Sequence, residues 1–150
     1  MALQDAILIK QGTGARKLAV FAGTNCGYCK RLEKDLMSLN DVSIYTFVIP
    51  ILGGDSPEKS NALWCAASPA KAWRDWMIEG KAPEHSGERN TSAIERNLAM
   101  SRKHKVRGTP AIVFESGYRA SGALPAAEIE KRLASIGSGP ATASARTAKP

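Results

Sequence analysis

The feature that most constrains this chain is a pair of cysteines, Cys26 and Cys29, with Gly27 and Tyr28 between them. The apolar run 17–22 before the pair lies between glycines, and its length is typical of a buried strand rather than a helix. From Cys26 onward, apolar residues recur at helical spacing and charged residues fill the other positions, which predicts an amphipathic helix. The cysteines therefore lie where a buried strand passes into the first turn of a helix.

This position is typical of a redox-active pair. Two cysteines separated by two residues can close a small disulfide ring and open it again. The amide groups of a helix N-terminus carry about half a positive charge, which stabilises a thiolate on the first cysteine. We therefore expect Cys26 to be the nucleophile. Cys29 lies one turn further into the helix, and we expect it to be less exposed and to resolve a mixed disulfide.

Three other interpretations of the pair are weaker and stay open. A zinc site needs two more ligands, but the remaining candidates, Cys65, His85 and His104, are scattered and form no second CxxC motif. A structural disulfide between Cys26 and Cys29 would close too short a loop to stabilise the fold much. Two buried, inert cysteines fit poorly with the charged residues that follow. We expect no metal, and no cofactor other than the redox-active disulfide of the pair.

The length of 150 residues is enough for one domain, and hydrophobic residues make up 43% of it, as in an ordinary globular protein. Short runs rich in apolar and β-branched residues, bounded by glycine or proline, predict its strands. A last helix is predicted from Pro125 to Gly137. Strands are expected at residues 6–10, 17–22, 42–49, 111–115 and 118–121.

The stretch from about residue 55 to 105 is predicted to be helical, because it contains three helix start signals. The second helix carries Trp73, Trp76 and Met77 and is expected to end at Gly80. Aromatic residues at this spacing can bind a ligand, but they more often form a core face, and we interpret them as packing. The start signals are Ser56-Pro57, Ser68-Pro69, and a capping box from Ser92 to Glu95.

A second motif, Gly108-Thr109-Pro110, comes directly before the strand at 111–115. Proline has no amide hydrogen, so it is tolerated only where a strand ladder is interrupted, and such a position can require a cis peptide bond. A threonine-proline pair before a strand is weak evidence by itself. Together with a CxxC motif at a junction of strand and helix, it strengthens the redox interpretation.

At this point the sequence resembles a family. The runs 20–32, 63–66, 106–114 and 121–133 are similar to the catalytic thioredoxin domain of the DsbC/DsbG periplasmic disulfide isomerases, and the resemblance extends from about Asp5 to Ile136. It implies an α/β thioredoxin fold, a central mixed β-sheet flanked by helices, with a helical insertion at about 55–105. The catalytic domain would then span 1–136. The tail 137–150 has no apolar periodicity and is expected to be disordered.

The resemblance also implies roles for six residues. Cys26 matches the exposed attacking cysteine, and Cys29 matches the resolving one. Gly27 and Tyr28 match the isomerase form of the active-site dipeptide. Thr109 and Pro110 match a cis-proline loop that lies against the disulfide and contacts the substrate chain, where backbone groups bind an extended peptide with little sequence preference.

The chain departs from the family in two places. Family members often carry a second, structural disulfide in the insertion. Cys65 matches its first cysteine, but the region of the partner, residues 81–86, contains none. We expect Cys65 to be a thiol that acts as a small buried hydrophobe. The isomerases also have an N-terminal dimerisation domain that is not seen here, which predicts a monomer with weak isomerase activity.

The net charge of +7 raises the question of an anionic partner. Its densest cluster, at 101–107, comes without a nucleic-acid recognition pattern, so we expect a solvated basic face and no nucleic acid. No apolar run approaches the roughly 18 residues that a membrane-spanning helix needs, so we expect no membrane-spanning helix. Residues 1–10 show no export signal, and a periplasmic location follows from the resemblance alone.

The sequence thus favours a thiol:disulfide oxidoreductase or disulfide isomerase that acts on misfolded or reduced protein substrates. Its electron partner would be a membrane thiol reductase or another dithiol protein. Two alternatives remain: a non-catalytic thioredoxin-like module that binds peptides at Pro110, and a cytoplasmic thioredoxin-type reductase.

Overall fold

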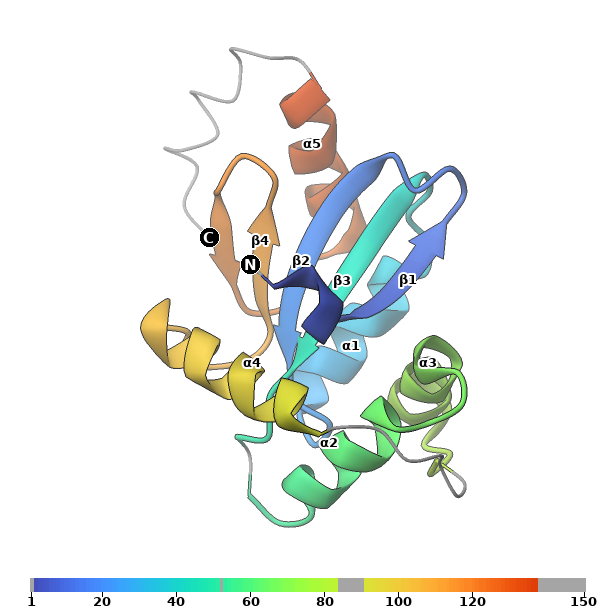
Figure 1. Cartoon of the computed structure of the whole chain (residues 1–150). Coiled ribbons are helices and arrows are strands. Elements are labelled where there is room, and N and C mark those ends of the chain that lie inside the picture. The colour runs from blue at the N-terminus through green and yellow to red at the C-terminus, as the bar shows by residue number, and fades with distance from the viewer. Residues whose placement is uncertain (1, 52, 84–90, 138–150) are drawn as a thin grey trace.

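A mixed β-sheet forms the centre of the computed structural model, which describes residues 2–51, 53–83 and 91–137 (Figure 1). Within these residues five strands lie side by side in the order β1-β3-β2-β4-β5. Their bounds agree with the sequence prediction to within one residue at each end. The strands are β1 (Ile7–Gln11), β2 (Arg16–Ala22), β3 (Val42–Val48), β4 (Ala111–Phe114) and β5 (Arg119–Ser121).

Strand β2 lies in the middle of the sheet, which explains its continuous apolar run. It pairs in parallel with β3 and antiparallel with β4. The outer strands are β1, antiparallel to β3, and β5, antiparallel to β4. Since parallel neighbours need a crossover, the chain between β2 and β3 forms helix α1 (Gly27–Leu36).

Helices cover both faces of the sheet. Helix α1 and helix α5 (Ala126–Gly137) contribute Leu32, Leu36, Ile129 and Leu133 to one buried cluster. On the other face, Phe21 and Phe47 stack at 5.4 Å between ring centroids, in a second cluster against which helix α4 (Ser92–Lys103) packs. The chain begins with a short 3-10 helix, Leu3–Asp5. This is the sheet flanked by helices that the sequence predicts.

The helical insertion between β3 and β4 is also present. It consists of α2 (Ser56–Trp64), α3 (Pro69–Glu79) and α4, and Figure 1 shows α2 and α3 near the end of the sheet where β2 and β3 finish. Helix α3 ends at Gly80, whose φ of 69° is the left-handed conformation that favours glycine. Trp73 and Met77 are buried in the core as predicted, but Trp76 is only partly buried.

The predicted N-caps are correct for one of the three insertion helices. Ser68 is the N-cap of α3, but Asp55 and Thr91, rather than Ser56 and Ser92, cap α2 and α4, and none of these cap side chains makes a capping hydrogen bond. Ser56 and Ser92 already belong to their helices. The Ser92 hydroxyl accepts a hydrogen bond from Arg96 one turn later at 3.0 Å instead of capping.

Three sequence predictions fall partly or wholly outside the described residues: His85, the second half of the segment 81–86, and the tail after Gly137. Gly137 itself is the last residue of α5 rather than the first of a tail. Among the described helices, none is long and apolar enough to cross a membrane.

Candidate active site

The two cysteines lie at the start of α1, as the sequence predicts. Cys26 is the N-cap residue of the helix, in extended conformation, and its Sγ accepts a hydrogen bond from the backbone N–H of Cys29 at 3.1 Å. This is the position where a side chain satisfies an unpaired amide of the first helical turn. A sulfur at this position accepts a hydrogen bond and lies at the positive end of the helix dipole, and both stabilise negative charge on it.

Burial of the pair differs from what the resemblance implies for an exposed attacking cysteine. Cys26 is 4% exposed and Cys29 is 2% exposed, so both are buried. The physical reason is the Thr109 loop, which covers Cys26. The residues between the cysteines are instead open to solvent, and Tyr28 is 62% exposed. A substrate therefore meets this dipeptide before it reaches the sulfur.

The surroundings of Cys29 favour its protonated form. Burial, and next the contact with the Cys26 sulfur, raise the pKa of Cys29 well above its ordinary value. Hydrogen bonds involving the Gly23 backbone and Thr109 act in the opposite direction but are weaker. Cys29 therefore keeps its proton at neutral pH.

The Thr109-Pro110 motif lies against the cysteines although it is far from them in sequence. The Thr109-Pro110 peptide bond is cis, and the Sγ of Cys26 donates a hydrogen bond to the Thr109 carbonyl oxygen at 3.4 Å. The Pro110 carbonyl accepts from the Gly122 N–H at 2.8 Å, which fixes the loop to the start of the chain after β5. Pairing of β4 with β2 thus brings Thr109 to Cys26.

Trp76 supports the active-site turn, a role that the sequence analysis missed. Its indole Nε1 donates to the carbonyl of Thr24 at 2.8 Å, and Thr24 is buried two residues before Cys26. Asn25 donates to Asp55 of the insertion at 3.0 Å. A half-buried tryptophan needs a partner for its N–H, but the sequence does not say where that partner is.

Glu33 is a second feature without a sequence signal. It lies in α1 and is 3% exposed. Its carboxylate accepts from the indole Nε1 of Trp73 at 3.0 Å and from Nε of Arg74 at 2.8 Å. Arg74 also donates to Gln11 at 2.6 Å. Because burying a charge is costly without a partner, this network fixes the insertion helix α3 against α1.

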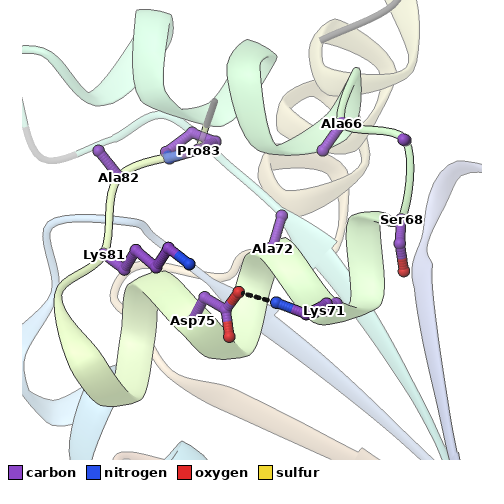
Figure 2. A pocket seen from close by; sticks show the side chains of 9 residues that line it. Ala66, Ser68, Lys71, Ala72, Asp75, Lys81, Ala82 and Pro83 are labelled. Atoms are coloured by element: carbon purple, nitrogen blue, oxygen red, sulfur yellow. Dashed lines mark hydrogen bonds and ion pairs between the residues drawn. The ribbon is translucent and has the colours of Figure 1, made fainter. Parts of the chain in front are cut away.

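Cys65 lies apart from the reactive pair, at the C-cap of α2, and is partly rather than fully buried. It forms no disulfide within the described residues. A pocket of about 270 Å³ opens beside it, and Figure 2 shows Ala66 and Ser68 lining it together with Lys81 and Pro83. Residues 81–83, the described part of the segment 81–86, therefore face the residue that follows Cys65 across this pocket.

The described residues contain no group of three or more histidine, cysteine or acidic side chains arranged to hold a metal ion. His104, one of the zinc candidates, is exposed at the end of α4 and is separate from the cysteines. The site itself holds two thiols in contact, one at a helix N-terminus and one that keeps its proton.

Comparison with known proteins identifies the family. Residues 3–137 match the family model described as a thioredoxin-like domain. The chain is 47% identical over 131 residues to the "Probable thiol:disulfide interchange protein DsbC" of Bordetella parapertussis, covering 87% of this chain and 46% of that protein. It is 26% identical over 134 residues to the thiol:disulfide interchange protein DsbC of Escherichia coli, covering 87% and 56% respectively.

A solved structure agrees with this match. The disulfide interchange protein from Neisseria gonorrhoeae superposes with a TM-score of 0.84 at 35% identity, over 89% of this chain and 96% of that one. The chain thus belongs to the thioredoxin-like domain family, and it is similar to the DsbC thiol:disulfide interchange proteins. It spans about half the length of the curated relatives that it matches. The predicted thioredoxin fold with a helical insertion is confirmed.

Proposed function

We propose that this chain exchanges disulfides with protein substrates through the Cys26–Cys29 couple. The observation that carries the proposal is the sulfur of Cys26, which is held between the N–H of Cys29 at 3.1 Å and the Thr109 carbonyl at 3.4 Å at the N-terminus of α1. The names of its relatives, thiol:disulfide interchange proteins, support the same activity.

The exchange would begin with the Cys26 thiolate attacking one sulfur of a substrate disulfide. A Cys26–substrate disulfide forms, the substrate S–S bond breaks, and the second substrate sulfur leaves as a thiolate. If a substrate thiolate then attacks the mixed disulfide, Cys26 is released and the substrate is isomerised. If Cys29 loses its proton and attacks Cys26 instead, the substrate leaves reduced and the pair is oxidised. The oxidised pair would run this second route backwards and donate its disulfide.

The proton on Cys29 determines which route is taken. Because burial raises the pKa of Cys29, the resolving attack is slow at neutral pH and leaves time for a substrate thiol to attack first. This balance slows release by reduction, and it leaves the prediction of weak isomerase activity unchanged, since that prediction concerns dimerisation and not the cysteine pair. We propose the same assignment of roles as the resemblance implies, with Cys26 attacking and Cys29 resolving.

The substrate chain would lie along the Thr109-Pro110 loop. As the resemblance implies, the backbone of this loop would contact an extended peptide with little sequence preference. The exposed Gly27 and Tyr28 would form the opposite side of the contact. Protein substrates, a membrane thiol reductase or another dithiol partner, and a periplasmic location all fit this proposal through the resemblance.

The redox equilibrium of the pair against glutathione tests the proposal. A reversible Cys26–Cys29 couple at about −120 to −230 mV supports an oxidising or isomerising role. A value near about −270 mV would instead indicate a thioredoxin-type reductase. A pair that never cycles would contradict catalysis and favour a peptide-binding module.

A further inference from the structure

Two basic grooves are each lined by a residue that neighbours the cysteine pair, Gly27 in one and Thr109 in the other. The first begins at Gly27, runs between α1 and the end of α3, and has a volume of about 540 Å³. Its cations are Lys30, Arg31 and Lys34. The second, of about 470 Å³, lies along the Thr109-Pro110 loop and contains Lys105, Arg107 and Arg119.

Among the residues that the structure describes, few carboxylates balance the charges of the grooves. No described acidic residue lines the second groove, and Glu79 is the described acidic residue of the first. Near the first groove, Asp55 forms an ion pair with Lys59 at 3.9 Å and accepts from Asn25. Six cations in the two linings thus face one carboxylate, and the potential over the site is positive.

Aromatic rings contact two of these cations, Lys30 and Arg31, and also the neighbouring Lys59. The Nζ of Lys59 lies 4.0 Å from the centroid of the Trp76 ring, and that of Lys30 lies 4.9 Å from it. Arg31 lies 5.3 Å from the centroid of Tyr28, the exposed residue between the cysteines. Cation–π contacts of this kind fix the positions of the charges at the surface.

Each groove is lined by a residue that neighbours Cys26, although the cysteine itself lines neither. The first starts at the residue after Cys26, and the second includes Thr109, whose carbonyl is 3.4 Å from the Sγ of Cys26. An extended peptide advances about 3.3 Å per residue, so the residues within a few positions of a bound cysteine would lie in the grooves.

We propose that the two basic grooves select protein segments with aspartate or glutamate on both sides of the reacting cysteine. This inference rests on the proposed function and adds a substrate class to it. Carboxylates near the substrate cysteine would form ion pairs in the grooves, and the positive potential would speed their approach. The charge of +7 then has a function at the site instead of being an incidental surface property.

The test uses three synthetic peptides, each with one cysteine in a mixed disulfide with 2-mercaptoethanol and flanked on both sides by pairs of Glu, Gln or Lys. The second-order rate of reduction by the full chain is measured at about 20 mM and about 500 mM salt. We expect the order Glu, Gln, Lys, with roughly tenfold between the extremes at low salt and a much smaller difference at high salt.

Matched double variants locate the effect. Lys105→Gln with Arg107→Gln removes two exposed cations of the second groove and should lower the ratio of the Glu rate to the Lys rate by several-fold. Lys10→Gln with Lys17→Gln is the control, because it removes the same charge from two exposed cations at the opposite end of β1 and β2. The control should leave all three rates unchanged.

Equal rates for the three peptides, or an equal loss of the ratio in both double variants, would overturn the inference while leaving the proposed function intact. If no peptide is reduced, the proposed function fails. The grooves are then still tested by fluorescence anisotropy of the same peptides with serine for cysteine and a neutral dye, where tighter binding of the Glu peptide supports the inference. In the same assay, a single-stranded DNA oligomer competes with unlabelled Glu peptide for the bound dye-labelled peptide. If the DNA displaces the labelled peptide at the lower concentration, the grooves bind nucleic acid and the inference is overturned.

Discussion

The reactive pair and Cys65 are thiols at opposite ends of two helices. Cys26 is the N-cap of α1, and Cys65 is the C-cap of α2. The N-terminus of a helix attracts negative charge, whereas its C-terminus repels it, so the same side chain meets opposite fields in the two places. Cys26 also contacts a second thiol and a loop carbonyl. Position, rather than residue type, therefore distinguishes the proposed nucleophile from Cys65.

Substituting the cysteines one at a time gives the largest expected effects and tests this comparison first. Cys26→Ser should reduce disulfide exchange to the background level, because a serine hydroxyl is not ionised at neutral pH. Cys65→Ser should retain most of the activity. The activity of both variants is measured as the rate at which they reduce a protein disulfide, with a thiol reagent to detect the thiols that are released. Full activity in the Cys26 variant, or its loss in the Cys65 variant, would reverse the assignment of the two regions.

The next effect concerns the pH dependence of release. Cys29→Ser should accumulate a covalent Cys26–substrate adduct that intact-mass spectrometry detects. In the native chain the adduct should become shorter-lived as pH rises, because burial raises the pKa of Cys29 and its thiolate fraction grows about tenfold per pH unit below that pKa. An adduct lifetime that is the same from pH 6 to pH 9 would show that proton loss from Cys29 does not limit release.

A third prediction concerns the link between the active-site helix and the insertion that carries Cys65. Glu33→Ala removes the buried acceptor of Trp73 and Arg74 and should lower the free energy of unfolding by about 3 kcal/mol. Asp75→Ala is the control, because it breaks the Lys71–Asp75 ion pair of the same insertion helix, where Lys71 is exposed, and should cost less than about 1 kcal/mol. Urea denaturation measures both, and equal costs would contradict the anchoring role of Glu33.

The smallest expected effect comes from the ion pair between Arg96 of the insertion and Asp5 near the N-terminus. Arg96 of α4 donates two hydrogen bonds to the buried carboxylate of Asp5 and holds the pKa of Asp5 below its ordinary value. A lowered pKa stabilises the fold above the unfolded pKa of the carboxyl, and this contribution disappears as pH falls through the folded pKa. Arg96→Gln should therefore lower the free energy of unfolding slightly at pH 7 and leave it almost unchanged near pH 2. Thermal unfolding across this range would show whether the difference persists in acid.

The strands, the position of the CxxC motif between a strand and a helix, and the proline loop could be predicted from the sequence, because each has a local sequence signal. Apolar runs between glycines placed β2, and the proline before β4 indicated the loop. The burial of Cys26 had no such signal, since it depends on Thr109 packing from a distant segment. The cap residues were misplaced by one position because Ser56 and Ser92 suit both a cap and a first turn.

The polar supports of the site were beyond sequence reasoning for the same reason. Trp76 has the spacing of a core residue, yet it donates a hydrogen bond to the carbonyl of Thr24, and its ring makes cation–π contacts with two lysines. Glu33 has the pattern of a solvent-facing helix residue and is buried because α3 covers it. Charged residues on a helix indicate exposure only until another element packs over them.

The contact between Cys26 and Thr109 joins residues 83 positions apart in the sequence. We expect such a contact to form late in folding, because the entropy of closing a long loop must be overcome before β4 can pair with β2. A nascent or unfolded copy of the chain therefore carries an ordinary dithiol, open to any oxidant in its surroundings. The environment of the pair is complete only after the sheet has folded. The rate at which a small thiol reagent modifies Cys26 should therefore change as the sheet refolds.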